Sequence, residues 1–241
     1  MKKEYYKIAE LIIAEDENIL ALNKPAFLST LDERETERIS LLRLAKSYNT
    51  DLQVCHRLDK ETSGIILFSK NNEIYREISI LFEHRKISKV YHAICQGNHN
   101  FKNFEINKPL STNSKGFSKI DFGGGKESLS IINTLKVYKH FTLLECKPIT
   151  GRLHQLRVHL KSVNAPISAD ERYGAEMPLL SSFKRKFKLG KFEDEKPIIN
   201  RVALHAFSLN FELCGKKYCL EAPYPKDFKT FCTLLEKYDQ I

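Results

Sequence analysis

Apolar residues along this chain follow two spacings: continuous or alternating runs that predict strands, and spacings of three to four residues that predict helices. Strands are predicted over residues 17–23, 64–68, 87–96, 129–138, 140–147, 203–213 and 216–221. Helices are predicted over residues 39–48, over 72–84 with Asn72 as the cap, from Thr150 to Val163, and over 226–238 after Pro225. Because strands and helices are interspersed without regular alternation, the pattern predicts an α+β fold with a mixed or antiparallel sheet.

Two segments lack either pattern. Residues 116–125 hold four glycines and are expected to form a loop. Residues 176–200 contain Pro178, Gly190 and Pro197 beside a basic cluster at 184–191. We expect this second segment to be a mobile basic insertion within one domain, and not a linker between domains.

The composition excludes several classes of protein. A chain of 241 residues with 42 % hydrophobic and 29 % charged residues has enough apolar material for a core, which excludes disordered and collagen-like proteins. No apolar run is long enough to span a membrane, and no signal peptide follows the basic first residues. The net charge of +9 indicates a polyanion partner such as nucleic acid, although a basic surface without such a partner is the alternative.

The six cysteines are spaced too widely for a structural zinc site, because none forms a Cys-x-x-Cys pair. They are Cys55, Cys95, Cys146, Cys214, Cys219 and Cys232. We expect reduced thiols of a cytoplasmic protein, most of them small residues of the core.

Four segments concentrate side chains that could carry chemistry: residues 56–64, 89–93, 150–159 and 201–206. Each also has an ordinary structural interpretation. In the first, Asp59 and Thr62 are common turn residues and Arg57 is a typical solvated charge. The third fits the basic face of an amphipathic helix, and its two histidines are five apart, which does not suit zinc. The second and fourth fit plain strands.

Taken together, the four segments resemble the RluA-type family of RNA pseudouridine synthases. The resemblance extends from residue 23 to about residue 228. It rests on Asn23-Lys24-Pro25, His56-Arg57-Leu58-Asp59 with Thr62-Ser63-Gly64, Tyr91 and Ala93, Thr150-Gly151-Arg152 through His159, Pro166-Ile167 with Asp170 and Tyr173-Gly174, and Leu204-His205-Ala206.

The resemblance implies the isomerisation of uridine to pseudouridine in ribosomal or transfer RNA, with no cofactor and no metal. It implies Asp59 as catalytic nucleophile or base, and Arg157 as the cation that keeps Asp59 ionised and oriented. Tyr91 is then the active-site tyrosine that stacks on uracil, and Leu204 packs beside the base. Arg57, Arg152 and His154 are implied substrate-binding residues that hold displaced RNA or phosphates, with the 184–191 cluster as a further candidate.

The implied fold is α+β, with a mixed, mostly antiparallel, bent sheet flanked by helices around a central cleft. We expect a single catalytic domain over residues 1–241, built of two halves and acting as a monomer. Only 22 residues precede Asn23, so we expect no N-terminal S4-type RNA-binding module.

The chain departs from the family pattern at a few positions. Residues 26–30 lack a histidine that usually follows Asn-Lys-Pro, and Asn164 and Ala169 stand where glycine is usual. These departures put the identity of the RNA in doubt more than the reaction. The main alternative function is a non-catalytic RNA-binding protein with the same fold. A Cys–His hydrolase using Cys55 or Cys95 and a metal-dependent hydrolase fit less well.

Overall fold

The computed structural model describes residues 6–33, 39–188, 190 and 194–241. The chain divides into two compact units. Unit 1 comprises Met1–Lys89 and Ala206–Pro223, and unit 2 comprises Val90–His205 and Tyr224–Ile241. Each unit has its own strands, helices and buried side chains, so the two are described separately.

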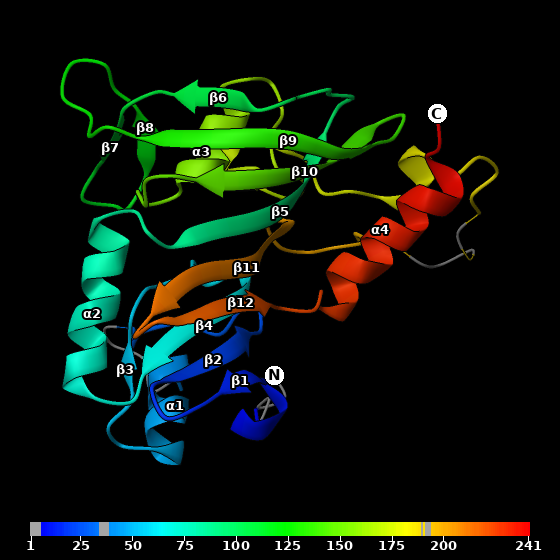
Figure 1. The fold of residues 1–241 in the computed structure, drawn as a ribbon. Coiled ribbons are helices and arrows are strands. Elements are labelled where there is room, and N and C mark those ends of the chain that lie inside the picture. The colour runs from blue at the N-terminus through cyan, green and yellow to red at the C-terminus, as the bar shows by residue number, and fades with distance from the viewer. Residues whose placement is uncertain (1–5, 34–38, 189, 191–193) are drawn as a thin grey trace. The chain divides into compact units, whose positions relative to one another are not determined.

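Unit 1 is a sheet in the order β1-β2-β4-β11, with β3 beside β4 and β12 beside β11 (Figure 1). The strands are β1 (Ile12–Glu15), β2 (Ile19–Lys24), β3 (Gln53–Val54), β4 (Ser63–Ser69), β11 (Leu204–Leu213) and β12 (Lys216–Glu221); β11 belongs to this unit from Ala206 onward. Every residue of β4 is buried, as its continuous apolar run predicts.

The helices of unit 1 begin at side chains that cap their first amides. They are α1 (Leu41–Tyr48) and α2 (Asn72–Glu83), and a short 3₁₀ turn, η1 (Ile8–Glu10), precedes β1. Ser40 caps α1 by accepting a hydrogen bond from Arg43 N. The cap of α2 is Asn71, whose side chain accepts from Ile74 N, and not Asn72 as the sequence suggested.

Unit 2 is an antiparallel sheet in the order β5-β10-β9-β6, with a separate hairpin β7–β8 (Figure 1). The strands are β5 (Ser88–Gln96, in this unit from Val90), β6 (Phe104–Asn107), β7 (Leu110–Thr112), β8 (Ser118–Ile120), β9 (Leu129–Val137) and β10 (Phe141–Pro148). The helical elements are α3 (Gln155–Lys161), η2 (Glu171–Tyr173), η3 (Leu180–Ser182) and α4 (Lys226–Tyr238).

The core of unit 2 joins its sheet to α3 and α4. Leu156 and Leu160 of α3 and Phe228 and Phe231 of α4 are buried with the strand residues in one cluster. Phe183, inside the segment expected to be a basic insertion, is buried in the same cluster. The basic cluster follows Phe183, and its member Lys191 lies outside the described residues.

The helix predicted from Thr150 begins five residues later. His154, directly before α3, has a left-handed backbone with φ of 55°, which a helix cannot continue through. The Gln155 side chain accepts hydrogen bonds from Thr150 Oγ1 at 2.7 Å and Arg152 N at 3.0 Å, so residues 150–154 form a fixed loop. Leu153 and Val163 therefore lie outside the helix, and the expected helical face is shorter.

The α+β fold with a mixed, mostly antiparallel sheet is confirmed. In the part of the chain that the structure describes, no helix has the length and apolar character needed to cross a membrane.

Candidate active site

Asp59 lies in the loop between β3 and β4, at the first position of a tight turn. Thr62 N closes the turn by donating to Asp59 O at 3.1 Å. The preceding residue is held by the buried Thr30, whose hydroxyl donates to Leu58 O at 3.0 Å and accepts from Leu58 N at 3.2 Å. Asp59 is half-buried. Its carboxylate is therefore carried by backbone that is fixed on its N-terminal side.

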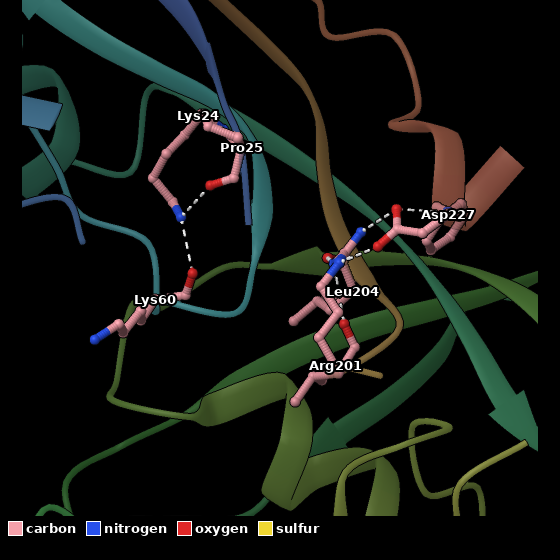
Figure 2. Close-up of polar contacts among 8 residues, drawn as sticks. Lys24, Pro25, Lys60, Arg201, Leu204 and Asp227 are labelled. Carbon is pink, nitrogen blue, oxygen red and sulfur yellow. Dashed lines mark hydrogen bonds and ion pairs between the residues drawn. The ribbon is translucent and has the colours of Figure 1, made fainter. Parts of the chain in front are cut away.

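Lys24 fixes the other side of the same turn. Its ammonium is fully buried and donates to Pro25 O at 3.0 Å, Leu28 O at 2.8 Å and Lys60 O at 3.1 Å. Figure 2 shows the Lys24 side chain reaching Pro25 O and Lys60 O. Phe27 N also donates to Lys60 O, at 2.8 Å. The loop after β2 is thus bonded to the residue that follows Asp59.

His56 and Gly64 anchor the two ends of the Asp59 loop. Leu67 N donates to His56 Nε2 at 3.0 Å, and burial, assisted by the charge of Lys89, lowers the pKa of His56 to about 3. His56 is therefore neutral near pH 7 and acts here as an acceptor. Gly64 has φ of +115°, and a Cβ there would lie 2.2 Å from Ala206 O in the same unit. Only glycine fits this position of the motif.

Arg157 is buried on α3 and is held by two side chains of unit 2. Its Nε donates to Asp170 Oδ2 and its Nη2 to Asp170 Oδ1, both at 2.7 Å. The Tyr173 ring lies against its guanidinium at 5.0 Å. The side chains of Arg157 and Asp170 are 6 % and 1 % exposed. Arg157 was expected on a polar helix face, but it is an internal cation with a fixed orientation.

The segment that carries Asp170 uses left-handed backbone at the two positions where the family usually has glycine. Asn164 has φ of 58° and Ala169 has φ of 62°. Asparagine tolerates this conformation, whereas alanine adopts it at a cost of about 1–2 kcal/mol. The departures noted in the sequence therefore change side chains while keeping the backbone that glycine favours.

Tyr91 and Leu204 belong to the sheet and core of unit 2. Tyr91 lies on β5 opposite Cys146 of β10 and packs against the main cluster, of which the buried Leu204 is a member. Ile94 N donates to Ala203 O at 3.0 Å, which ties β5 to the residue before Leu204. Tyr91 and Leu204 are therefore both held by strand pairing or core packing within unit 2.

The three predicted substrate-binding residues differ in exposure. Arg57 and Arg152 are exposed, and Arg152 Nε donates to Glu127 O at 3.1 Å. His154 is partly buried, and its Nδ1 is hydrogen-bonded to Tyr173 Oη at 2.9 Å. Arg157 and His154 thus share Tyr173 as a neighbour. Contact of any of these residues with RNA stays a prediction.

The structure also identifies residues whose role the sequence did not suggest. Lys24, Asp170 and Arg201 stood inside matched motifs or predicted strands, but each is a buried charge with a specific partner set. Asp59 and Arg57 belong to unit 1, whereas Arg157, Tyr91 and the other candidates belong to unit 2. The pairing of Asp59 with Arg157 accordingly stays a prediction.

The surroundings of Cys55 and Cys95 do not support the alternative of a Cys–His hydrolase. All six are free, and only Cys95 and Cys146 are fully buried, so the expectation that most are core residues was wrong. Burial raises the pKa of Cys55 to about 12 and that of Cys95 well above its usual value, so neither is a thiolate near pH 7. Among the described residues, no group of three or more His, Cys, Asp or Glu side chains is placed to hold a metal ion.

Comparisons with known proteins show the family of this chain. A family model described as RNA pseudouridylate synthase matches residues 18–162. The chain is 37 % identical to ribosomal large subunit pseudouridine synthase C of Buchnera aphidicola, over 91 % of this chain and 69 % of that protein. It is 36 % identical to the dual-specificity RNA pseudouridine synthase RluA of Vibrio cholerae, over 67 % of each chain. The solved structure of human RNA pseudouridylate synthase domain containing 4 has the same fold, with a TM-score of 0.72 at 22 % identity, covering 95 % of this chain and 94 % of that one.

Proposed function

Because this chain belongs to the RNA pseudouridylate synthase family, isomerases that convert uridine in RNA to pseudouridine, we propose that it acts on ribosomal RNA with Asp59 as its nucleophile or base. The observation that carries the assignment of Asp59 is the turn around it, which is closed by Thr62 and held by Thr30 and Lys24. A loop that only binds RNA has no need of an aspartate carried on backbone that is fixed in this way.

The reaction breaks the bond between uracil N1 and ribose C1′, turns the uracil, and joins its C5 to C1′. The proton on C5 leaves, a proton returns to N1, and no electrons are gained or lost overall. Asp59 serves this sequence either as a covalent nucleophile at C6 or C1′ or as a base toward a ribose proton. Each role requires the ionised carboxylate.

Arg157 is the proposed partner that keeps Asp59 ionised. Five N–H groups are carried by a guanidinium, and Asp170 takes two of those of Arg157. We propose that this fixed guanidinium is the cation that pairs with Asp59. A carboxylate in a closed site tends to be neutral, and a fixed guanidinium opposes this tendency.

Tyr91 and Leu204 are proposed to hold the uracil. An aromatic ring supplies a stacking face, and the Tyr91 hydroxyl is a candidate acceptor of the C5 proton. The exposed Arg57 and Arg152, together with His154, are proposed to hold the displaced strand and its phosphates. We expect no cofactor and no metal in the chemistry, and a monomeric protein in the cytoplasm.

Ribosomal RNA is favoured as substrate because several similar proteins are named for the large ribosomal subunit. Transfer RNA is the second candidate, because other similar proteins are named as dual-specificity enzymes. One measurement distinguishes these two candidate substrates. Release of tritium from uridine C5 in each purified RNA fraction, made in a host without its own synthases, identifies the class that reacts.

The same assay tests Asp59. Asp59→Asn is expected to abolish tritium release while leaving RNA binding at matched salt within about twofold, since the amide has the shape of the carboxylate without its charge. Asp51→Asn, at an exposed position of the same unit, is the control and should keep full activity. Release by Asp59→Asn at the wild-type rate contradicts the assignment. Binding without release by the wild type on every RNA fraction favours the non-catalytic alternative.

A further inference from the structure

A second buried arginine, Arg201, lies three residues before Leu204, where the chain enters β11. Its side chain is 0 % exposed. Its Nε donates to Asp227 Oδ2 at 2.7 Å and its Nη2 to Asp227 Oδ1 at 3.0 Å. Its Nη1 donates to Val202 O at 3.1 Å and to Leu204 O at 3.2 Å. Figure 2 shows one guanidinium joined both to Asp227 and to the backbone around Leu204.

The backbone between Arg201 and Leu204 has little freedom left. Leu204 N donates to Val202 O at 2.7 Å, which makes a very tight turn. Ala203 N donates to Ser168 O and Ala203 O accepts from Ile94 N, both at 3.0 Å. Because Val202 O accepts from both Leu204 N and the guanidinium, the turn and the cation support each other. Leu204 is thus presented from a position fixed on both sides.

Asp227 connects this turn to the start of α4. It lies in the first turn of the helix, where a negative charge is favoured by the helix dipole. Burial raises the pKa of Asp227, but the hydrogen bonds and charge of Arg201 outweigh burial and leave the pKa below its usual value. The carboxylate is therefore charged near pH 7 and holds the fork of Arg201 in one orientation.

The Arg201 side of this ion pair is buried and the Asp227 side is 33 % exposed. Such a pair is not needed for stability alone, because well-packed apolar side chains of similar volume often stabilise as much as a buried ion pair or more. An ion pair instead defines direction, since both N–H···O pairs must align at once. Here the fixed guanidinium also bonds Val202 O and Leu204 O, so it orients the backbone that carries Leu204.

We propose that Arg201 and Asp227 are positioning residues that fix Leu204 against the uracil in the active site. The proposal rests on the proposed function, because it takes Leu204 as a residue that packs beside the base. Neither Arg201 nor Asp227 touches the substrate. They act by holding one pocket leucine at the distance that the reacting uracil requires.

The test compares Asp227→Asn with Asp239→Asn. Asp239 is the control, because it is also a carboxylate of unit 2 whose two oxygens accept from one residue, here His140 N and His140 Nδ1; its side chain is 1 % exposed, against 33 % for Asp227. Both substitutions are expected to lower the unfolding temperature. Only Asp227→Asn should lower kcat for tritium release, by about 10-fold or more, with KM for RNA within about twofold, because a misplaced group costs up to about 100-fold in rate.

A double-mutant comparison shows whether the effect passes through Leu204. Leu204→Ala alone and Leu204→Ala with Asp227→Asn should have nearly equal kcat, because the Arg201–Asp227 pair no longer has a leucine side chain to position. Amide hydrogen exchange over residues 201–205 should also speed up in Asp227→Asn, which reports the loosened turn without any activity measurement.

The outcomes distinguish failure of the positioning role from failure of the proposed function. The positioning role is overturned, with the wild type active, by any one of three results. These are a kcat loss in the double variant equal to the product of the two single losses, unchanged amide exchange at residues 201–205, and wild-type kcat in Asp227→Asn. A wild type that releases no tritium from any RNA overturns the proposed function itself, and the positioning role with it.

Discussion

Replacing Lys24 with methionine removes the charge that joins the loop after β2 to the Asp59 turn. The methionine side chain has a similar length and fills the same buried space. It cannot donate hydrogen bonds, so Pro25 O, Leu28 O and Lys60 O all lose the ammonium. Lys60 O keeps the hydrogen bond from Phe27 N. Leu28 O, which is buried, and Pro25 O, which is partly buried, are therefore left without a replacement for this donor.

The expected loss of stability follows from those two carbonyls. A buried polar group that loses its partner costs about 1–3 kcal/mol, so the two together cost about 2–6 kcal/mol. Part of this is offset because the variant no longer buries an ammonium. We expect a net loss of about 3 kcal/mol, which lowers the unfolding temperature by about 6–12 °C in a chain of this size.

The assay combines urea unfolding, thermal unfolding and tritium release on one set of variants. Lys70→Met is the control, because Lys70 pairs with Glu15 at 2.7 Å on the same unit but remains 21 % exposed. Loss of that pair should cost about 1 kcal/mol or less. In Lys24→Met, kcat should also fall by about 10-fold or more, because the residue after Asp59 is released.

The reasoning is refuted if Lys24→Met and Lys70→Met unfold at the same urea concentration with unchanged slopes. Equal values would mean that the three carbonyls find other donors once the ammonium is gone. A large loss of stability with wild-type kcat would instead show that Lys24 holds the fold without holding Asp59 in place.

Two further predictions concern unit 2. Asp170→Asn removes one of the two acceptor oxygens that Asp170 offers to Arg157, so we expect a loss of about 2–3 kcal/mol in thermal unfolding and a kcat for tritium release lower by about 10-fold or more. Wild-type kcat would show that the orientation of Arg157 does not depend on Asp170. Burial, opposed by the charge of Glu145, lowers the pKa of His92 to about 4, whereas an unfolded histidine titrates near 6.5. Below about pH 6.5 the unfolded chain therefore binds a proton that the folded chain does not, so the free energy of unfolding should fall by about 2 kcal/mol between pH 7 and pH 5 through this residue. His92→Gln should lose that part of the pH dependence in urea unfolding, and an unchanged pH dependence would contradict the assignment.

The parts of the fold that could be predicted from the sequence are those where one local pattern determines one element. The hairpin of β11 and β12 and the helix α4 match their expected ranges almost to the residue, because apolar alternation, a Cys-Gly turn and Pro225 mark them. The short strands β6, β7 and β8 were not predicted. They have three or four residues each, too few for an apolar period to stand out.

The start of α3 was misplaced for a different reason. Leucine spacing continues back to Leu153, but the backbone at His154 is left-handed, and the side chain of Gln155 bonds the preceding loop. Neither feature can be predicted from the spacing of apolar residues. The periodicity also suggested a solvated side chain for Arg157, whereas the structure buries it against Asp170.

The buried charges show most clearly where sequence reasoning ends. A lysine, arginine or aspartate in a sequence is most simply interpreted as a solvated residue, since these side chains are rarely buried without a partner. Lys24, Arg157 and Arg201 are all buried, and their acceptors lie between 1 and 36 residues away along the chain. Such pairings depend on how loops return to one another, which no local spacing encodes. Each of these cations holds backbone or a side chain of the proposed site. The motif residues therefore predict the chemistry, and the buried charges show how the chain around them is held in place.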